Sequence, residues 1–196
     1  MEKYPENNIV YNNQQISNRI PFITSIICTL FIFIYCLDYL FEFANILILI
    51  TSLITTILLS PYIKLEENTK RIVVLAVSVI GTFAVSFEYN ICRLDFGFGF
   101  FNSYTYSGSI GIMLGLFQIA SVISLILILL SAFMSQLNKK TTIICLFISG
   151  ILGLIFNIYE IIYLNPGASS RIYIWFGLAV LFWFLTQATY LISNKQ

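Results

Sequence analysis

The chain contains no histidine and few charged residues. Only 10% of its 196 residues are Asp, Glu, Lys or Arg, against about 25% in an ordinary soluble domain. Histidine is the commonest general base and a frequent ligand of zinc and haem iron, so its absence excludes Ser-His and Cys-His catalytic arrangements and most zinc sites. We therefore expect a protein that is not an enzyme, and no cofactor is predicted.

The sequence also lacks an excess of positive or negative charge, and its cysteines are not spaced in pairs. Ten Lys and Arg face nine Asp and Glu, a formal net charge of +1, so no basic surface indicates a nucleic-acid partner. The four cysteines have no C-x-x-C spacing, which indicates neither a disulfide framework nor a metal site. They are Cys28, Cys36, Cys92 and Cys145.

Long apolar runs are what the sequence has in excess, since 59% of its residues are hydrophobic. About 20 apolar residues cross a bilayer as a helix. The runs predict transmembrane helices at 21–37, 43–62, 72–91, 109–137, 142–164 and 172–192, within one domain over 20–193. Residues 1–19, rich in Asn and Gln, are predicted to be a polar cytoplasmic tail that is disordered or lies on a surface. The expected fold is an all-α integral membrane protein in contact with the lipid bilayer.

The first apolar run needs a break, because a single helix over 20–63 would be about 66 Å long, roughly twice the hydrocarbon thickness. Asp38 and Glu42 are its only charged residues. Placing both carboxylates at the membrane surface costs much less than burying them at its centre. The sequence therefore predicts a turn at 38–45.

Lysine and arginine residues sort between the two ends of the predicted helices. Because alternate loops face opposite sides, eight basic residues fall on the side of the N-terminus, whereas Arg93 and Arg171 fall opposite. The eight are Lys3, Arg19, Lys64, Lys70, Arg71, Lys139, Lys140 and Lys195. Since such residues collect on the cytoplasmic side, the sequence predicts a multi-pass cell-membrane protein with both termini in the cytoplasm.

Six helices joined in this way are expected to form three hairpins, each closed on the outer side. One acidic residue lies near the outer end of the first helix of each hairpin, about 24 to 27 Å from its predicted start. These are Asp38, Glu88 and Glu160, in the similar settings CLDYLF, SFEYNI and IYEIIY. Gly81 and Gly153 each precede an acid by seven residues. The similarity suggests a weak threefold repeat.

The three acids are the candidate ion or polar site. If Asp38, Glu88 and Glu160 point inward at one depth, their carboxylates could bind a cation or relay a proton. The alternative is that each faces water at the membrane surface, beside the tyrosines that gather there. We favour the second interpretation, because acids at the edge of a membrane cost far less than acids at its centre.

A few polar and small residues lie within the predicted helices. Gln118, Asn157 and Gln187 could line a transport path, but we favour hydrogen bonding between helices, worth about 0.6 to 2 kcal/mol each. Ser52, Thr55 and Thr56 form a hydroxyl face on the second helix. Small residues at four-residue spacing predict close helix packing; they are Ser107, Gly111 and Gly115, and Ser149 with Gly153.

The outward-facing segment 92–108, CRLDFGFGFFNSYTYSG, is rich in aromatic residues. Its alternating pattern fits a short aromatic loop or a small β-hairpin. Its aromatic side chains are either an anchor at the membrane surface or a binding surface for a partner. The candidate partner surface consists of Phe96, Phe98, Phe100, Tyr104 and Tyr106.

Three classes of function follow from these features, of which an intramembrane enzyme is the least favoured because the sequence has no histidine and no nucleophile motif. The first, which we favour, is an accessory or structural subunit that binds other membrane proteins or a second copy of itself. It needs no polar pathway and accounts for nearly featureless apolar helices. The second is a small transporter or channel for a cation or small solute, using Asp38, Glu88 and Glu160.

Overall fold

Six helices make up the structure, a computed structural model that describes residues 7–39, 43–63, 65–91, 109–133, 139–163 and 170–193. The helices are α1 (Asn7–Tyr39), α2 (Phe43–Leu59), α3 (Glu67–Ile91), α4 (Ser109–Phe133), α5 (Lys139–Tyr163) and α6 (Ser170–Ser193). The described residues contain no strand. The predicted all-helical chain with six helices is thus confirmed, and the break between α1 and α2 falls within the predicted turn at 38–45.

Helix α1 begins much earlier than the sequence indicated. It runs from Asn7 through Pro21 to Tyr39, whereas the predicted helix covered 21–37. Extending an existing helix fixes one residue per added hydrogen bond and avoids the cost of nucleation. The Asn- and Gln-rich segment can therefore continue a helix that the apolar part has nucleated, although it has no apolar period of its own.

Helix α2 ends before its predicted limit at 62. The residue before a proline is disfavoured in the helical region, and Pro61 stops the helix two residues after Leu59. The chain then turns, with Ser60 N donating to the Ile57 carbonyl oxygen at 3.1 Å and Ile63 N donating to that of Ser60 at 3.3 Å. Helix α2 has 17 residues, about 25 Å of length.

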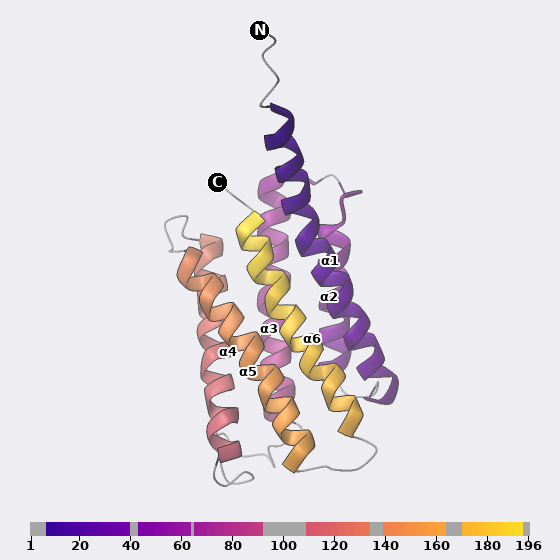
Figure 1. Ribbon diagram of the computed structural model, residues 1–196, viewed down its shortest axis with the longest axis vertical. Helices are drawn as coiled ribbons and strands as arrows, with labels where there is room; N and C mark the ends of the chain where they lie inside the picture. The colour runs from indigo at the N-terminus through magenta and orange to yellow at the C-terminus, as the bar shows by residue number, and fades with distance from the viewer. Residues whose placement is uncertain are drawn as a thin grey trace.

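The six helices form a closed ring. Each helix packs against the next one along the chain, and α6 closes the ring against α1. In Figure 1, α1, α6 and α5 form a front layer, and α2, α3 and α4 lie behind them. Helix α1 begins and α6 ends at the same end of the bundle. Because α6 lies in front of α3, long side chains from these two helices meet in the middle.

The two helices of each proposed hairpin do contact each other, as α1 with α2, α3 with α4, and α5 with α6. The contacts of α2 with α3, α4 with α5, and α6 with α1 complete the ring. These contacts do not distinguish three separate hairpins from one continuous six-helix bundle. The arrangement as three repeated hairpins therefore stays a prediction.

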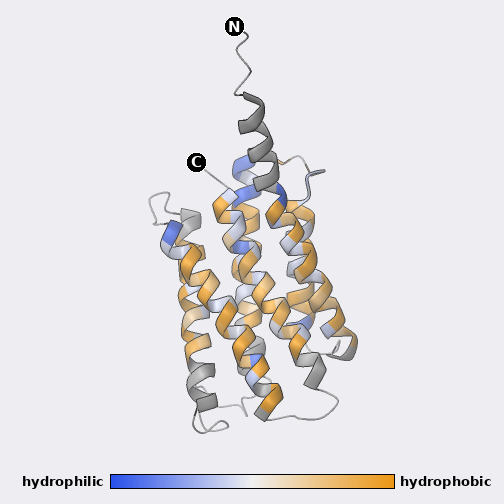
Figure 2. Cartoon of the chain, viewed as in Figure 1, coloured by the Kyte–Doolittle hydropathy of each residue, from blue (hydrophilic) through white to orange (hydrophobic). Residues whose placement is uncertain are grey.

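Large apolar side chains cover the outside of the bundle, and polar side chains lie within it. Figure 2 shows that hydrophobic residues predominate along the described helices. Leu30, Ile57 and Ile151 are 55%, 55% and 48% exposed, whereas Ser78 and Gln187 are 0% and 2% exposed. Charged and amide side chains of soluble domains are mostly exposed instead. The distribution is that of a protein whose surroundings are apolar.

Within the described residues, four helices are long and apolar enough to cross a membrane. The spans are Arg19–Leu37, Glu67–Val85, Lys139–Tyr159 and Ile174–Ser193, and two shorter apolar segments are Asn45–Leu59 and Ile119–Leu130. These lengths and compositions are compatible with a multi-pass membrane protein.

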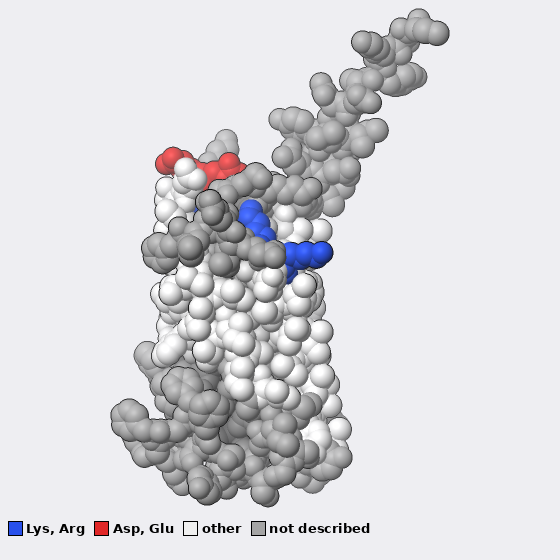
Figure 3. All heavy atoms as spheres, turned by 90° about the vertical axis from the view of Figure 1, so that its left-hand side faces the viewer, with Lys and Arg blue, Asp and Glu red and all other residues white. Residues whose placement is uncertain are grey.

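The described charged side chains gather at one end of the bundle, where α1, α3 and α5 begin (Figure 3). They are Arg19, Glu66, Glu67, Lys70, Arg71, Lys139 and Lys140. Next to them lies a band of uncharged residues. The positions match an apolar band in the hydrocarbon layer with charged residues at one of its surfaces.

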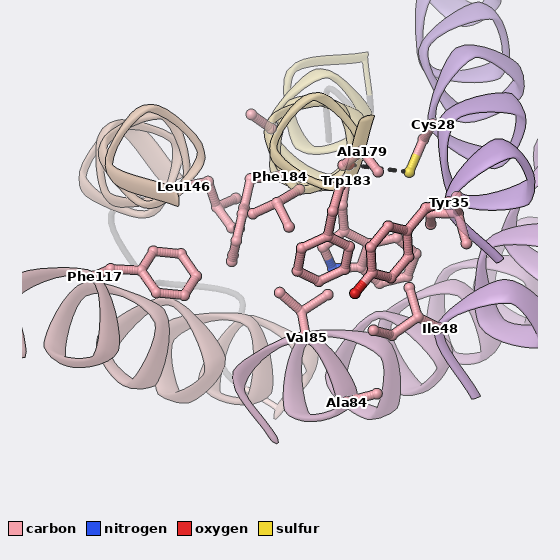
Figure 4. Packing of buried hydrophobic residues seen from close by; sticks show 14 of the residues in the cluster. Cys28, Tyr35, Ile48, Ala84, Val85, Phe117, Leu146, Ala179, Trp183 and Phe184 are labelled. Atoms are coloured by element: carbon pink, nitrogen blue, oxygen red, sulfur yellow. Dashed lines mark hydrogen bonds between the residues drawn. The ribbon is translucent and has the colours of Figure 1, made fainter. Parts of the chain in front are cut away.

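One hydrophobic core runs through all six helices. Figure 4 shows side chains converging from each of them, with Trp183 and Phe184 of α6 near its middle. Trp183, Phe184, Phe117 and Phe156 are all at most 1% exposed. Because lipid is as apolar as these side chains, close packing rather than exclusion of water stabilises such a core in a membrane.

Candidate functional site

The three predicted acidic residues lie near the ends of three helices. Asp38 is next to the last residue of α1, and Glu88 and Glu160 lie in the last turns of α3 and α5. Since these three helices begin at the same end of the bundle, the acids share the opposite end. Their side chains lie outside the described residues. Whether they meet as an ion site therefore stays a prediction.

The candidate partner surface, Phe96, Phe98, Phe100, Tyr104 and Tyr106, also lies outside the described residues, as does the whole segment 92–108. Ile91 and Ser109, between which the segment runs in the sequence, end α3 and begin α4. Its conformation and its role stay predictions.

A buried polar cluster joins α6 to α3 in the middle of the bundle. Ser78 of α3 lies within hydrogen-bonding reach of both the carbonyl oxygen of Val74, at 2.6 Å, and the Oε1 atom of Gln187. Its hydroxyl has one proton for two acceptors. An amide turned so that Nε2 donates to Ser78 resolves this, because Ser78 then donates to Val74. The favoured interpretation of Gln187, hydrogen bonding between helices, agrees with this geometry.

Trp183 makes the second link between the same helices, one turn from Gln187. Its Nε1 atom donates to Thr82 Oγ1 at 3.1 Å. The indole ring lies directly over Gly81, where an added Cβ would overlap it and would stand 3.0 Å from Thr51 Oγ1. Gly81 therefore makes the space that lets an α6 side chain reach α3. Together, Thr51, Gly81, Thr82, Trp183 and the Gln187–Ser78 pair form what we call the central cluster.

Gly153, the second glycine of the proposed repeat, also makes space for a ring. An added Cβ there would stand 2.7 Å from Val180 Cγ1 and 2.8 Å from Phe117 Cε2. Gly153 thus allows α4 and α6 to approach α5, as its small size predicted. Asn157, one turn on, donates from Nδ2 to the Gly153 carbonyl oxygen at 2.7 Å within its own helix.

The hydroxyl face of α2 is directed into the bundle, but most of its bonds are local. Thr55 Oγ1 donates to the Thr51 carbonyl oxygen at 2.8 Å, and Ser52 Oγ to that of Leu49 at 2.9 Å. Thr56 Oγ1 also lies 3.0 Å from Thr29 Oγ1 of α1. These hydroxyls mainly bond to carbonyl oxygens of their own helix, which satisfies them inside the bundle.

Comparable pairs join other neighbours in the ring. Ser124 Oγ of α4 lies 2.8 Å from Ser149 Oγ of α5, and Thr24 Oγ1 of α1 lies 3.5 Å from Thr189 Oγ1 of α6. Ser149 belongs to the small residues predicted to allow close packing. Ser107, the side chain of Gln118 and the surroundings of Gly111 and Gly115 lie outside the described part of the chain.

Sequence reasoning missed Thr51, Ser78, Thr82 and Trp183, which complete the central cluster. One available signal was the spacing of Trp183 and Gln187, which places both on one face of α6. A matching signal was the spacing of Ser78 and Thr82 on α3. Neither signal says that these two faces meet, because α3 and α6 are far apart in sequence.

No family model, no curated protein and no solved structure matches this chain.

Proposed function

We propose that the protein is an accessory or structural subunit of the cell membrane that binds other membrane proteins. The observation that supports this is the central cluster, where an indole ring fills the space over Gly81 and buried hydroxyls and an amide bond to one another. Groups engaged in this way hold helices together. Such a protein would bind its partners through its outer surface and through the ends of its helices.

A hydrophilic path needs side chains that offer hydrogen bonds to a passing solute. Thr51, Thr55 and Ser52 give theirs to carbonyl oxygens of α2, and Trp183 gives its own to Thr82. Because these polar groups bond to the protein itself, they favour a role in packing the helices over a role in lining a transport path. The orientation that goes with the proposal has both termini in the cytoplasm, supported by the basic residues gathered where α1, α3 and α5 begin.

The test compares two variants of the tagged full-length chain after extraction in mild detergent. In the first, Phe96→Ser, Phe98→Ser and Phe100→Ser remove aromatic surface from the 92–108 segment. In the second, the three candidate acids are replaced by amides. We expect the first variant to lose co-purifying membrane proteins that the second retains at wild-type amounts. Retention by both variants, with unchanged growth of the cells, would contradict the proposed docking role of the aromatic segment.

A second candidate function is a small transporter or channel for a cation or small solute. It rests on the placement of Asp38, Glu88 and Glu160 at one end of three helices. Carboxylates in the last turn of a helix face the negative end of its dipole, so a cation near them would be favourable. Flux into vesicles that contain the purified chain measures this function. The variants Asp38→Asn, Glu88→Gln and Glu160→Gln should abolish such flux if the acids carry it.

A further inference from the structure

Helix α2 is the shortest of the six helices that the structure describes. Its 17 residues extend over about 25 Å, whereas the hydrocarbon layer of a bilayer is about 30 Å thick. The chain that continues from Leu59 leads to Glu66 and Glu67 at the start of α3, and both of these residues are exposed. Hydrocarbon therefore gives way to water between Leu59 and Glu66.

An exposed aromatic ring lies between these two points. Tyr62 is 89% exposed, whereas no other large apolar side chain among the described residues exceeds 61%. Leu65, three residues on, is 41% exposed. Because so much of the surface of Tyr62 is exposed, packing against the bundle does not account for its position. A side chain with an apolar body and a polar tip is favourable at a boundary between hydrocarbon and water.

The backbone donors of the turn that follows α2 are satisfied within the chain. Ser60 N donates to the Ile57 carbonyl oxygen at 3.1 Å, and Ile63 N donates to that of Ser60 at 3.3 Å. Tyr62 N donates to Ser60 Oγ at 3.3 Å, and Pro61 has no N–H group. No backbone donor from Ser60 to Ile63 therefore depends on water. This suits a turn at the edge of hydrocarbon, where an unpaired N–H group is costly.

The apolar outer surface of α2 leads into this turn without a charged residue. Leu53 and Ile57 of α2 are 44% and 55% exposed, and the sequence has no charged residue from Phe43 to Ile63. Tyr62 thus stands between side chains that face acyl chains and carboxylates that face water. Tyrosine is enriched at this level of membrane proteins. Because the lipid-facing surface continues up to the turn, these positions favour lipid headgroups over a protein partner.

We propose that the turn after α2, residues 60–63 together with Leu65, is an anchor in the phospholipid headgroup layer. The ring of Tyr62 lies among the glycerol and upper acyl groups with its hydroxyl toward water, and Leu65 lies at the edge of hydrocarbon. The anchor completes the membrane crossing that α2 is too short to make alone, and it fixes the depth at which α2 ends. It does not depend on the proposed subunit function, because a transporter with the same α2 would need it equally.

The first test measures the access of water to position 62 in phosphatidylcholine nanodiscs. The full-length variants Tyr62→Cys and Thr69→Cys react with a membrane-impermeant maleimide, and mass spectrometry of the peptides gives the rate at each position with the native cysteines in place. Each rate is divided by that of the unfolded chain, which corrects for neighbouring charges. Because a thiol in apolar surroundings is a poor nucleophile, we expect position 62 to react severalfold more slowly than position 69, which is exposed on α3. Equal rates would place Tyr62 in water and overturn the anchor.

The second test identifies what covers the ring. The variant Tyr62→p-benzoylphenylalanine keeps an aromatic side chain and, on irradiation in native membranes, bonds to whatever lies beside it. We expect phospholipid adducts at position 62 to exceed severalfold those of the matched control Thr69→p-benzoylphenylalanine, measured by mass spectrometry of the peptides. Crosslinks from position 62 to another protein chain in place of lipid would overturn the headgroup anchor and assign the turn to a protein partner.

Discussion

Gly81 and Gly153 hold corresponding positions in the sequence, seven residues before Glu88 and Glu160, but the structure uses them differently. Gly81 receives the indole ring of Trp183, whose Nε1 is fixed by its bond to Thr82. Gly153 receives one methyl group of Val180 and one edge of the Phe117 ring. The same residue type therefore makes room for a hydrogen-bonded indole between α3 and α6, and for two apolar side chains between α5 and its neighbours.

The largest effect is expected for Gly81→Ala. Overpacking costs about 1–3 kcal/mol or more, while alanine gains about 1 kcal/mol of helix propensity over glycine. Because the indole cannot move without breaking its bond to Thr82, we expect a net loss of about 2 kcal/mol. Reversible unfolding of the purified chain in mixed micelles measures this. A more stable variant would show that the Trp183 ring is not fixed over Gly81.

Trp183→Phe is expected to cost about 1–2 kcal/mol, because it leaves a gap over Gly81 and removes the bond to Thr82. The informative experiment combines it with Gly81→Ala. The smaller ring leaves room for the added methyl group, so the alanine should cost much less in this background than in the wild type. Additive losses in the same unfolding assay would contradict direct contact between these positions.

Gly153→Ala should be milder, with a net loss of about 1 kcal/mol. The added Cβ would stand 2.7 Å from Val180 Cγ1 and 2.8 Å from Phe117 Cε2, a smaller overlap than the one with the Trp183 ring at Gly81. The unfolding assay again gives the value, and Phe117→Leu in the same background should recover part of it. A loss as large as that of Gly81→Ala would erase the difference between the two glycines.

The smallest effect concerns the polar part of the central cluster. Ser78→Ala removes the partner of a buried amide and should cost about 0.6 kcal/mol, the average for a hydrogen bond between membrane helices. Gln187→Leu removes the amide itself, leaves no buried polar group unsatisfied, and should cost no more than Ser78→Ala. Measured stabilities in the opposite order would show that the amide has further partners that stabilise the bundle.

Particular residues show which features could be predicted from the sequence and why others could not. The break near Asp38 and the apolar segments followed from the cost of charge in hydrocarbon, which is a local property of the chain. The start of α1 at Asn7 was missed, because helix extension depends on a nucleus elsewhere and not on the pattern of the extended residues. The candidate acids were singled out by position, yet their relation in space depends on how the helices rotate in the bundle.

The sequence by itself determined the class of protein, the number of helices and the end at which basic residues gather, because each depends on hydropathy and charge along short segments. Only the tertiary structure decided that α6 closes the ring against α1, that Trp183 fills the space over Gly81 and that Gln187 meets Ser78. Helices that are apolar on nearly every side can pack in many rotations. Side-chain shape and a few buried hydrogen bonds select one of them.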